Sequence, residues 1–326
     1  MKFQMTNFEL RSRRPLAGEG ESDPIRNPQF AIRNSSGFSL IEVMVAVALM
    51  SLIVIALMAV FSSTQKAFRA SVTQTDVLEG GRAAMELITQ DLRQMTPSGG
   101  TSNVVGGVIF GAVNFFSLDN SYAPSLTYSP LQQSLPGSIA SRINFLNYFF
   151  LLGRENTKWI GIGYAVGSTN TTQLYPLYRF YAETNLATPP RVLFNDFLLA
   201  VNNGQWTNMS HVMDGVVHFV VRADDPNGYP MTNTYQFNSG QWVTNRNVWF
   251  YPPAPGLREL GFYFFSNTVP ASVELELGVL EDRPLQHAGS LPTAVLRTQY
   301  LQQQSGKVHL FRQLVTIPNV DPTAYQ

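Results

Sequence analysis

The longest apolar run in this chain predicts a helix that can cross a membrane. In residues 43–61 the only polar side chain is Ser51. A helix of this length spans roughly 28 Å at ~1.5 Å per residue, about the thickness of the hydrocarbon core of a bilayer. We therefore expect a membrane-spanning helix near the N-terminus.

After this run the pattern becomes amphipathic. Leu78, Met85 and Leu92 recur every seven residues, and polar side chains occupy most of the positions between them. We expect the helix to continue to about residue 95, where the sequence Thr96-Pro97-Ser98-Gly99-Gly100 ends it. Gly80-Gly81 is either a kink in this helix or the loop between two separate helices.

Beyond residue 100 the chain alternates apolar and polar positions in short runs, a pattern typical of strands. In residues 272–280, for example, apolar residues alternate with Glu274 and Glu276. The apolar stripe of residues 78–95 needs a cover, and packing it on one face of a sheet gives an α+β domain. We expect residues 281–307 to form loops. The strand candidates are residues 104–118, 143–152, 159–166, 174–181, 192–201, 215–222, 248–251, 260–265, 272–280 and 308–317.

Composition narrows the possible partners. The chain has 22 basic and 22 acidic residues and no net charge, so nothing indicates a nucleic-acid partner. Charged residues make up only 13% of the chain, and aromatic residues 12%, which favours a β-rich domain that buries surface against other proteins. There is no cysteine, which excludes disulfides and thiol chemistry.

One acidic residue, Glu42, lies at the N-terminal edge of the apolar run. A carboxylate in lipid is costly, by ~2.5–3.5 kcal/mol at the centre of a helix and less near its end. Glu42 is either an interfacial acid that reaches the headgroups or a functional acid that needs a positive partner.

The residues around Glu42 carry a resemblance to a known family. Gly37-Phe38-Ser39-Leu40-Ile41-Glu42 resembles the processing site of type IV pilins and type II secretion pseudopilins. The resemblance implies cleavage after Gly37 by a prepilin peptidase and N-methylation of the new N-terminal residue, Phe38. Ser39, Leu40 and Ile41 complete the motif, and Glu42 has the family's role of setting the register between subunits.

Physical chemistry is consistent with that role. A free amine at Phe38 is cationic, with an unperturbed pKa of ~7.7–8.0. Burial penalises an unpaired charge, so it favours a pair between Glu42 and the Phe38 amine of a neighbouring subunit.

The resemblance also implies an organisation for the whole chain. We expect a leader peptide at residues 1–37, a transmembrane helix at 38–61, its amphipathic continuation at 62–96 and a β-rich globular domain at 97–326. The fold class is α+β: a long N-terminal membrane-spanning helix packed against a C-terminal antiparallel sheet domain, as in pilins. A conventional secretory signal is the alternative, but residues 43–61 are too long for its 7–15-residue apolar region.

The implied setting is the bacterial inner membrane, crossed once, with the C-terminal domain in the periplasm and a place at the tip of a pseudopilus or pilus. Implied partners are the prepilin peptidase, other pilin or pseudopilin subunits that bind through the N-terminal helix, the inner-membrane assembly platform and the membrane. The chain is most similar to J-type minor pseudopilins and related minor pilins, and has extra segments near 119–140 and 230–256. The segments that carry this finer resemblance are Gly81-Arg82, Asp91-Leu92-Arg93, Ile162-Gly163-Tyr164-Ala165-Val166, Leu177-Tyr178-Arg179, Val212-Met213-Asp214-Gly215 and Pro270-Ala271-Ser272.

No catalytic motif accompanies these features. The four histidines, His211, His218, His287 and His309, do not form H-E-x-x-H, and neither G-x-S-x-G nor a P-loop occurs. We expect no enzyme, metal or cofactor. Glu281-Asp282 beside Arg283 is expected in a solvated loop.

Two clusters have a binding interpretation and a structural one. Asp214, Asp224, Asp225 and Asn227 could contribute to a calcium site, but a calcium ion needs ~6–8 oxygens, and we favour an ordinary turn. A set of aromatic residues could bind carbohydrate, although core packing is their commoner use. These are Trp206, Trp242, Trp249, Tyr229 and Tyr251.

Two functions remain open at this point. The first is a minor pseudopilin or minor pilin that assembles through Glu42 and the Phe38 amine. The second is a membrane-anchored binding module, for polysaccharide or a secreted substrate, that uses the same leader without forming a filament.

Overall fold

The structure is a computed structural model, and it describes residues 37–325 with internal gaps. The predicted leader therefore lies outside the described residues, apart from Gly37. The chain divides into two compact units, Met1–Phe61 and Ser62–Gln326. The gaps are residues 101–103, 106–107, 110, 124–127, 129, 136, 138, 168–173, 207–208, 232–236, 239–240, 243–246 and 252–260.

A single 54-residue helix, α1 (Leu40–Arg93), contributes to both units. It runs through Gly80-Gly81 without a break, so the interpretation as two separate helices is wrong. Gly81 is buried, and a Cβ atom there would lie 2.3 Å from the ring of Phe311. Glycine at this position therefore lets the strand that carries Phe311 pack close to the helix.

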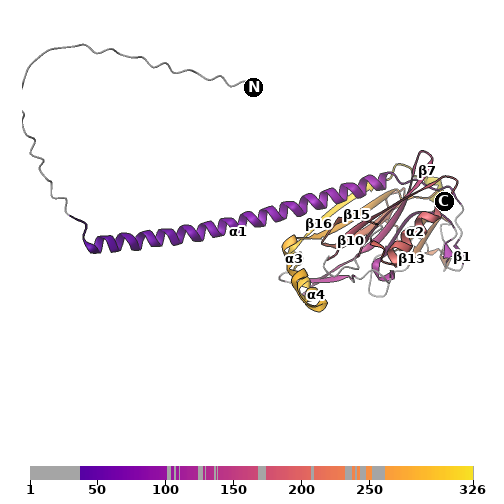
Figure 1. The fold of residues 1–326 in the computed structure, drawn as a ribbon. Coiled ribbons are helices and arrows are strands. Elements are labelled where there is room, and N and C mark those ends of the chain that lie inside the picture. The colour runs from indigo at the N-terminus through magenta and orange to yellow at the C-terminus, as the bar shows by residue number, and fades with distance from the viewer. Residues whose placement is uncertain are drawn as a thin grey trace, which may run out of the picture. The chain divides into compact units, whose positions relative to one another are not determined.

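The globular unit contains two larger antiparallel sheets (Figure 1). The seven-stranded sheet has the order β13 (Val248–Tyr251), β14 (Gly261–Phe265), β3 (Val113–Asp119), β6 (Asn147–Glu155), β7 (Lys158–Val166), β8 (Leu177–Asn185) and β9 (Ser210–Met213). The three-stranded sheet has the order β10 (Val216–Asp224), β15 (Ser272–Leu280) and β16 (Val308–Thr316). The paired short strands are β1 (Val104–Val105) with β2 (Val108–Ile109), β4 (Leu131–Ser134) with β5 (Ser141–Asn144), and β11 (Phe237–Asn238) with β12 (Gln241–Trp242).

The main core lies between the C-terminal part of α1 and the two sheets. Buried side chains of α1, among them Met85, Ile88 and Leu92, belong to one apolar cluster with residues of both sheets. The two sheets touch directly, because the ring centroids of Phe149 in β6 and Phe219 in β10 are 5.7 Å apart. The predicted α+β class, with the helix on an antiparallel sheet domain, is confirmed, and the helix contacts two sheets rather than one.

A second core covers the opposite face of the seven-stranded sheet, where α2 (Arg191–Asn202) packs. Glycines in β7 make room for this helix. A Cβ atom on Gly163 would lie 2.4 Å from the ring of Phe197, and one on Gly161 would lie 2.8 Å from the Cβ of Leu193. The close approach of α2 therefore depends on these two positions.

Four predicted elements differ from the structure. Residues 143–152 contain the end of β5 and most of β6 rather than one strand. Residues 192–201 form helix α2 rather than a strand, because Leu193, Phe197 and Val201 recur every four residues and bury one helical face. Residues 104–118 contain three strands, β1, β2 and the start of β3, rather than one.

The predicted loop at 281–307 also contains regular structure. Within it lie α3 (Asp282–Ser290), α4 (Ala294–Gln302) and the 3-10 turn η4 (Ser305–Lys307). The N–H of Leu296 donates to the hydroxyl of Thr293, which begins α4 as a side-chain cap. Further 3-10 turns among the described residues are η1 (Asn120–Tyr122) and η5 (Pro322–Tyr325).

Candidate functional site

Ser39 and Glu42 form a reciprocal set of hydrogen bonds at the start of α1. The Glu42 Oε2 accepts hydrogen bonds from the N–H of Ser39 at 2.9 Å and from its hydroxyl at 3.1 Å. In return the N–H of Glu42 donates to the Ser39 carbonyl at 3.0 Å and contacts its Oγ at 3.4 Å. This S-x-x-E arrangement is a capping box, which satisfies N–H groups that the first helical turn leaves free.

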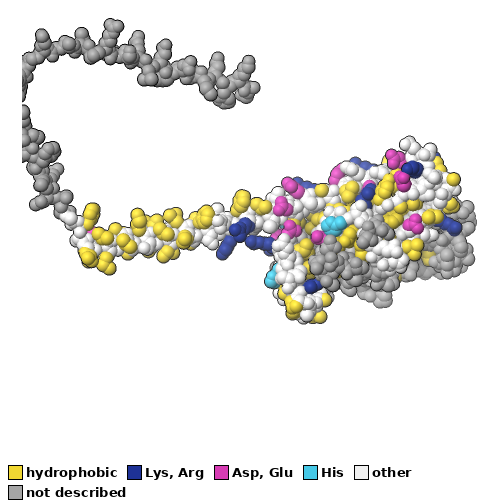
Figure 2. All heavy atoms as spheres, viewed as in Figure 1, with side chains coloured by type: hydrophobic (Ala, Val, Ile, Leu, Met, Phe, Trp, Pro, Cys, Tyr) yellow, Lys and Arg dark blue, Asp and Glu magenta, His cyan; other side chains and the backbone are white. Residues whose placement is uncertain are grey.

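The surroundings of this capping box are apolar and open. Phe38 is 85% exposed, and Leu40 and Ile41 are also exposed. An 18-residue window of α1 has a mean hydropathy of 3.0 with none of it buried, and by length and composition this helix can cross a membrane. Figure 2 shows hydrophobic side chains all along this part of α1. Such a surface requires lipid or other apolar helices around it.

A second polar group lies inside the globular unit, and we call it the Asp91 clamp. Its members are Asp91 of α1, Tyr164 of β7 and Arg179 of β8. The Asp91 Oδ2 accepts from the Tyr164 hydroxyl at 2.5 Å and from the Arg179 Nε at 2.7 Å, and Oδ1 accepts from the Arg179 Nη2 at 2.8 Å. Tyr164 and Arg179 are register partners on adjacent strands, so both strands hold the same carboxylate.

Burial and hydrogen bonding together determine the charge states of Tyr164 and Arg179. Asp91 is 3% exposed, and the Tyr164 ring belongs to the main core. Burial, with the charge of Asp91 and the hydrogen bond to it, raises the pKa of Tyr164 well above its usual value. The hydrogen bond to Asp91 raises the pKa of Arg179. At neutral pH the phenol is therefore a neutral donor and the guanidinium a cation, and together they satisfy a desolvated carboxylate.

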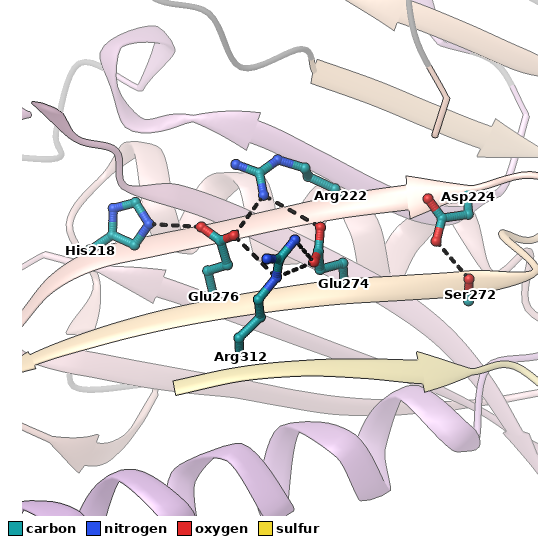
Figure 3. Close-up of polar contacts among 7 residues, drawn as sticks. All are labelled: His218, Arg222, Asp224, Ser272, Glu274, Glu276 and Arg312. Carbon is teal, nitrogen blue, oxygen red and sulfur yellow. Dashed lines mark hydrogen bonds and ion pairs between the residues drawn. The ribbon is translucent and has the colours of Figure 1, made fainter. Parts of the chain in front are cut away.

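The outer face of the three-stranded sheet carries paired charges (Figure 3). Glu276 accepts from Arg222 at 2.9 Å and lies 3.3 Å from the Nε2 of His218, and Glu274 pairs with Arg222 and Arg312. Burial raises the pKa of Glu276, but the hydrogen bond and charge of Arg222, with those of His218, outweigh it. Its pKa therefore lies below its usual value.

The acidic sequence around Asp225 forms a turn, as predicted. The Asp225 Oδ1 accepts from the N–H of Asn227 at 2.9 Å and from that of Tyr229 at 2.8 Å, which is an Asx turn. The neighbouring Asp224 accepts from the hydroxyl of Ser272 at 2.8 Å. Among the described residues, no group of three or more His, Cys, Asp or Glu side chains could hold a metal ion.

The remaining predicted polar residues lie in pairs. Glu281 is not in a solvated loop as predicted, because its side chain is only 13% exposed and its carboxylate lies 3.2 Å from His309 and 3.4 Å from Lys307. The other contacts are His211 with Asp214 at 3.0 Å and His287 against the ring of Tyr300 at 4.6 Å between centroids.

Of the aromatic residues considered for carbohydrate binding, two tryptophans pack in the second core. Trp206 is buried, with its ring centroid 5.1 Å from that of Tyr178, and Trp249 packs on Tyr263 at 5.8 Å. Tyr229 is exposed. The side chains of Trp242 and Tyr251 lie outside the described residues. The described tryptophans therefore serve packing rather than a shared aromatic surface.

The sequence carries a local signal for one of the two polar groups. The three residues of the other group lie in segments that carry the finer resemblance, but their spacing predicts no contact between them. The spacing of Ser39 and Glu42 is that of a capping box, and this signal is visible in the sequence alone. The Asp91 clamp joins residues 73 and 88 positions apart, and no local pattern predicts such contacts.

Comparison with known families gives one match, and it falls on the N-terminal segment. Residues 32–62 match the prokaryotic N-terminal methylation motif. The chain carries this motif at the capping box and along the exposed apolar part of α1. The match supports a prepilin-like protein of the type IV pilin class with a membrane anchor. Neither a curated protein nor a solved structure matches the chain.

Proposed function

We propose that this protein is a prepilin-like subunit that is cut after Gly37 and assembles with other subunits through its N-terminal helix. In this proposal residues 1–37 are the leader, 38–61 span the inner membrane, 62–96 continue the helix and 97–326 form a periplasmic domain. The protein acts as a minor subunit, most similar to the J-type, of a type II secretion pseudopilus or at the tip of a type IV pilus. Its work is structural rather than enzymatic.

The observation that carries the proposal is the methylation motif on the capped, exposed apolar part of α1. Glu42 at the edge of the apolar run makes the helix more costly to leave in lipid than an uncharged one. The capping box satisfies part of this carboxylate in the single subunit. The cationic amine of Phe38 in a neighbouring subunit supplies the charge partner that the capping box lacks.

Processing is tested with Gly37→Ala. We expect the prepilin peptidase to leave this variant uncut, which intact mass spectrometry of the membrane fraction detects as a chain longer than the wild-type chain. Gly20→Ala, which changes a glycine elsewhere in the leader, is the matched control and should be cut normally. Full processing of Gly37→Ala at the same bond contradicts the assignment of the cleavage site.

The charge of Glu42 is tested separately from its capping role with Glu42→Gln. Glutamine keeps an oxygen that accepts from Ser39, since Glu and Gln both serve in capping boxes, but it has no charge. We expect Glu42→Gln to be cut normally and to fail to co-assemble with other subunits in sheared filament or cross-linked membrane fractions. Glu79→Gln, an exposed acid further along α1, is the control.

The result for Glu42→Gln distinguishes between the two functions that the sequence leaves open. A Glu42→Gln protein that is processed, stable and keeps the full cellular function of the wild type contradicts the filament role. That result favours a membrane-anchored binding module, which needs the helix but no charge pair between subunits.

A further inference from the structure

The pattern of buried positions on α1 repeats along the helix axis. Apolar burial alone therefore does not fix the position of the two sheets along the helix. Most of its buried positions are apolar or small and lie three or four residues apart. A shift of one turn, about 5.4 Å, moves one such residue into the place of the next with similar burial. These buried positions are Val77, Gly81, Ala84, Met85, Ile88 and Leu92 of α1, and Met95 lies just beyond the end of the helix.

Asp91 breaks this repeat. Among the α1 residues whose burial the structure describes, it is the one charged side chain that is buried. In the observed register Tyr164 and Arg179 satisfy both of its oxygens. A slip of one turn would bring Leu87 of α1, or Met95 from just beyond its end, to the clamp and move the carboxylate among apolar side chains. An unpaired buried charge is strongly unfavourable, so the clamp discriminates against the slipped positions.

A second contact marks the same register less strictly. Gly81 fits against the ring of Phe311, but Phe311 lies on the edge strand β16 and is only partly buried. Its ring can turn toward solvent when a larger helix residue replaces Gly81. The buried Asp91 carboxylate cannot turn toward solvent in this way, because its two donors come from strands inside the seven-stranded sheet.

We propose that Asp91, Tyr164 and Arg179 are positioning residues that fix the axial register of α1 against the two sheets of the globular unit. The inference rests on the proposed function, because a subunit packed into a filament through its helix must present its domain at a defined place along that helix. Buried ion pairs are weak evidence for stability but are well attested as devices that specify register. A clamp with one carboxylate and two donors from adjacent strands fits the role of specifying register.

Cysteine cross-linking reads the register directly, because the natural chain has no cysteine. A Cβ atom on Gly153 lies 3.8 Å from the Cβ of Gln94, a separation suited to a disulfide. The pair Gln94→Cys with Gly153→Cys therefore reports the observed register. Gln90→Cys combined with Gly153→Cys reports a slip that brings Gln90, which lies one turn earlier in α1, to the place of Gln94. All pairs are made in the full chain and oxidised in its native membrane.

The test variant replaces the clamp by apolar residues of similar size: Asp91→Leu, Tyr164→Phe and Arg179→Met. We expect it to remain folded, to lose at least half of the Gln94–Gly153 cross-link and to gain cross-links at a slipped pair. Cross-linking confined to the observed pair at the wild-type yield would overturn the proposal. The matched control is Lys158→Met with Glu183→Met, an exposed ion pair on the same two strands, which should leave the pattern unchanged.

Rescue separates register from general stability. We expect the apolar variant to lose most of its co-assembly, and the Gln94–Gly153 disulfide to restore it without restoring the clamp. A variant that forms this disulfide and still fails to assemble would overturn the link between register and assembly. Failure of the proposed function looks different: the wild-type chain is then not cut at Gly37 or does not co-assemble, while its cross-linking pattern still reports the register.

Discussion

Removal of Asp91 alone gives the sharpest test of the packing between α1 and the sheets. The variant Asp91→Ala deletes the shared carboxylate but leaves both of its donors in place. Tyr164 then has a buried hydroxyl without its acceptor, and Arg179 has a guanidinium without its counter-ion. The helix itself gains from alanine, which has the higher helix propensity, so any loss comes from the tertiary contact.

The magnitude follows from the burial of the three side chains. Breaking a buried ion pair from one side costs about 3–5 kcal/mol when the remaining charge stays buried. The side chain of Arg179 is 21% exposed, so its guanidinium can partly rehydrate and the lower end of this range applies. The phenol of Tyr164 adds up to roughly 1–3 kcal/mol if it finds no other acceptor. We expect a loss of about 3 kcal/mol, roughly a 150-fold change in the folding equilibrium.

Urea unfolding of the full chain in detergent micelles, followed by tryptophan fluorescence, measures this loss. Glu183→Ala breaks the exposed pair with Lys158 and should leave the unfolding midpoint unchanged, because solvent screens that pair. The apolar replacement of the whole clamp should lose less than Asp91→Ala, since it leaves no unpaired charge. A free energy of unfolding for Asp91→Ala within about 1 kcal/mol of the wild type would refute this reasoning.

Two further predictions concern other parts of the globular unit. Gly163→Ala should cost about 1–3 kcal/mol of unfolding free energy, because its Cβ meets the ring of Phe197. Gly289→Ala is the control and should cost nothing, because the space around Gly289 is open. Equal effects of the two substitutions in urea unfolding would contradict the packing of α2. Glu276→Gln should be less stable than the wild type at pH 7. The folded-state pKa of Glu276 is lowered, so its stabilisation is present above its unfolded pKa of about 4.3 and is lost as pH falls through the folded value. Unfolding curves of the two proteins should therefore converge below about pH 4, and a constant difference down to pH 3 would contradict the ion pair with Arg222.

Much of the fold follows from periodicity in the sequence. The apolar repeat of Leu78, Met85 and Leu92 predicts the helix and its packed face, because that repeat depends only on local spacing. Strands such as β15 are predictable for the same reason, with Glu274 and Glu276 on the outer face. Where a run is apolar throughout, as in residues 192–201, periodicity does not separate a strand from a buried helix.

In that run the better signals lie at its edges and in its spacing. Pro189-Pro190 precedes α2, and proline is favoured just before and at the first turn of a helix. The polar helices α3 and α4 are harder to predict, because each buries few side chains and depends on caps such as Thr293.

The two polar groups also differ in how far the sequence predicts them. The motif at Gly37–Glu42 is contiguous, so the sequence alone predicts it, and the match to the methylation motif falls on the same residues. The Asp91 clamp depends on strand register between β7 and β8 and on the place of α1 above them. Those are tertiary facts, and a polar residue on a helix gives no local sign that it is buried.

Intact mass and N-terminal sequencing of the protein extracted from its native membrane test the central claim most directly. The account predicts a mature chain that begins at Phe38 and carries a methyl group on its α-amine. An uncut chain, or a chain cut near residue 62, would contradict it.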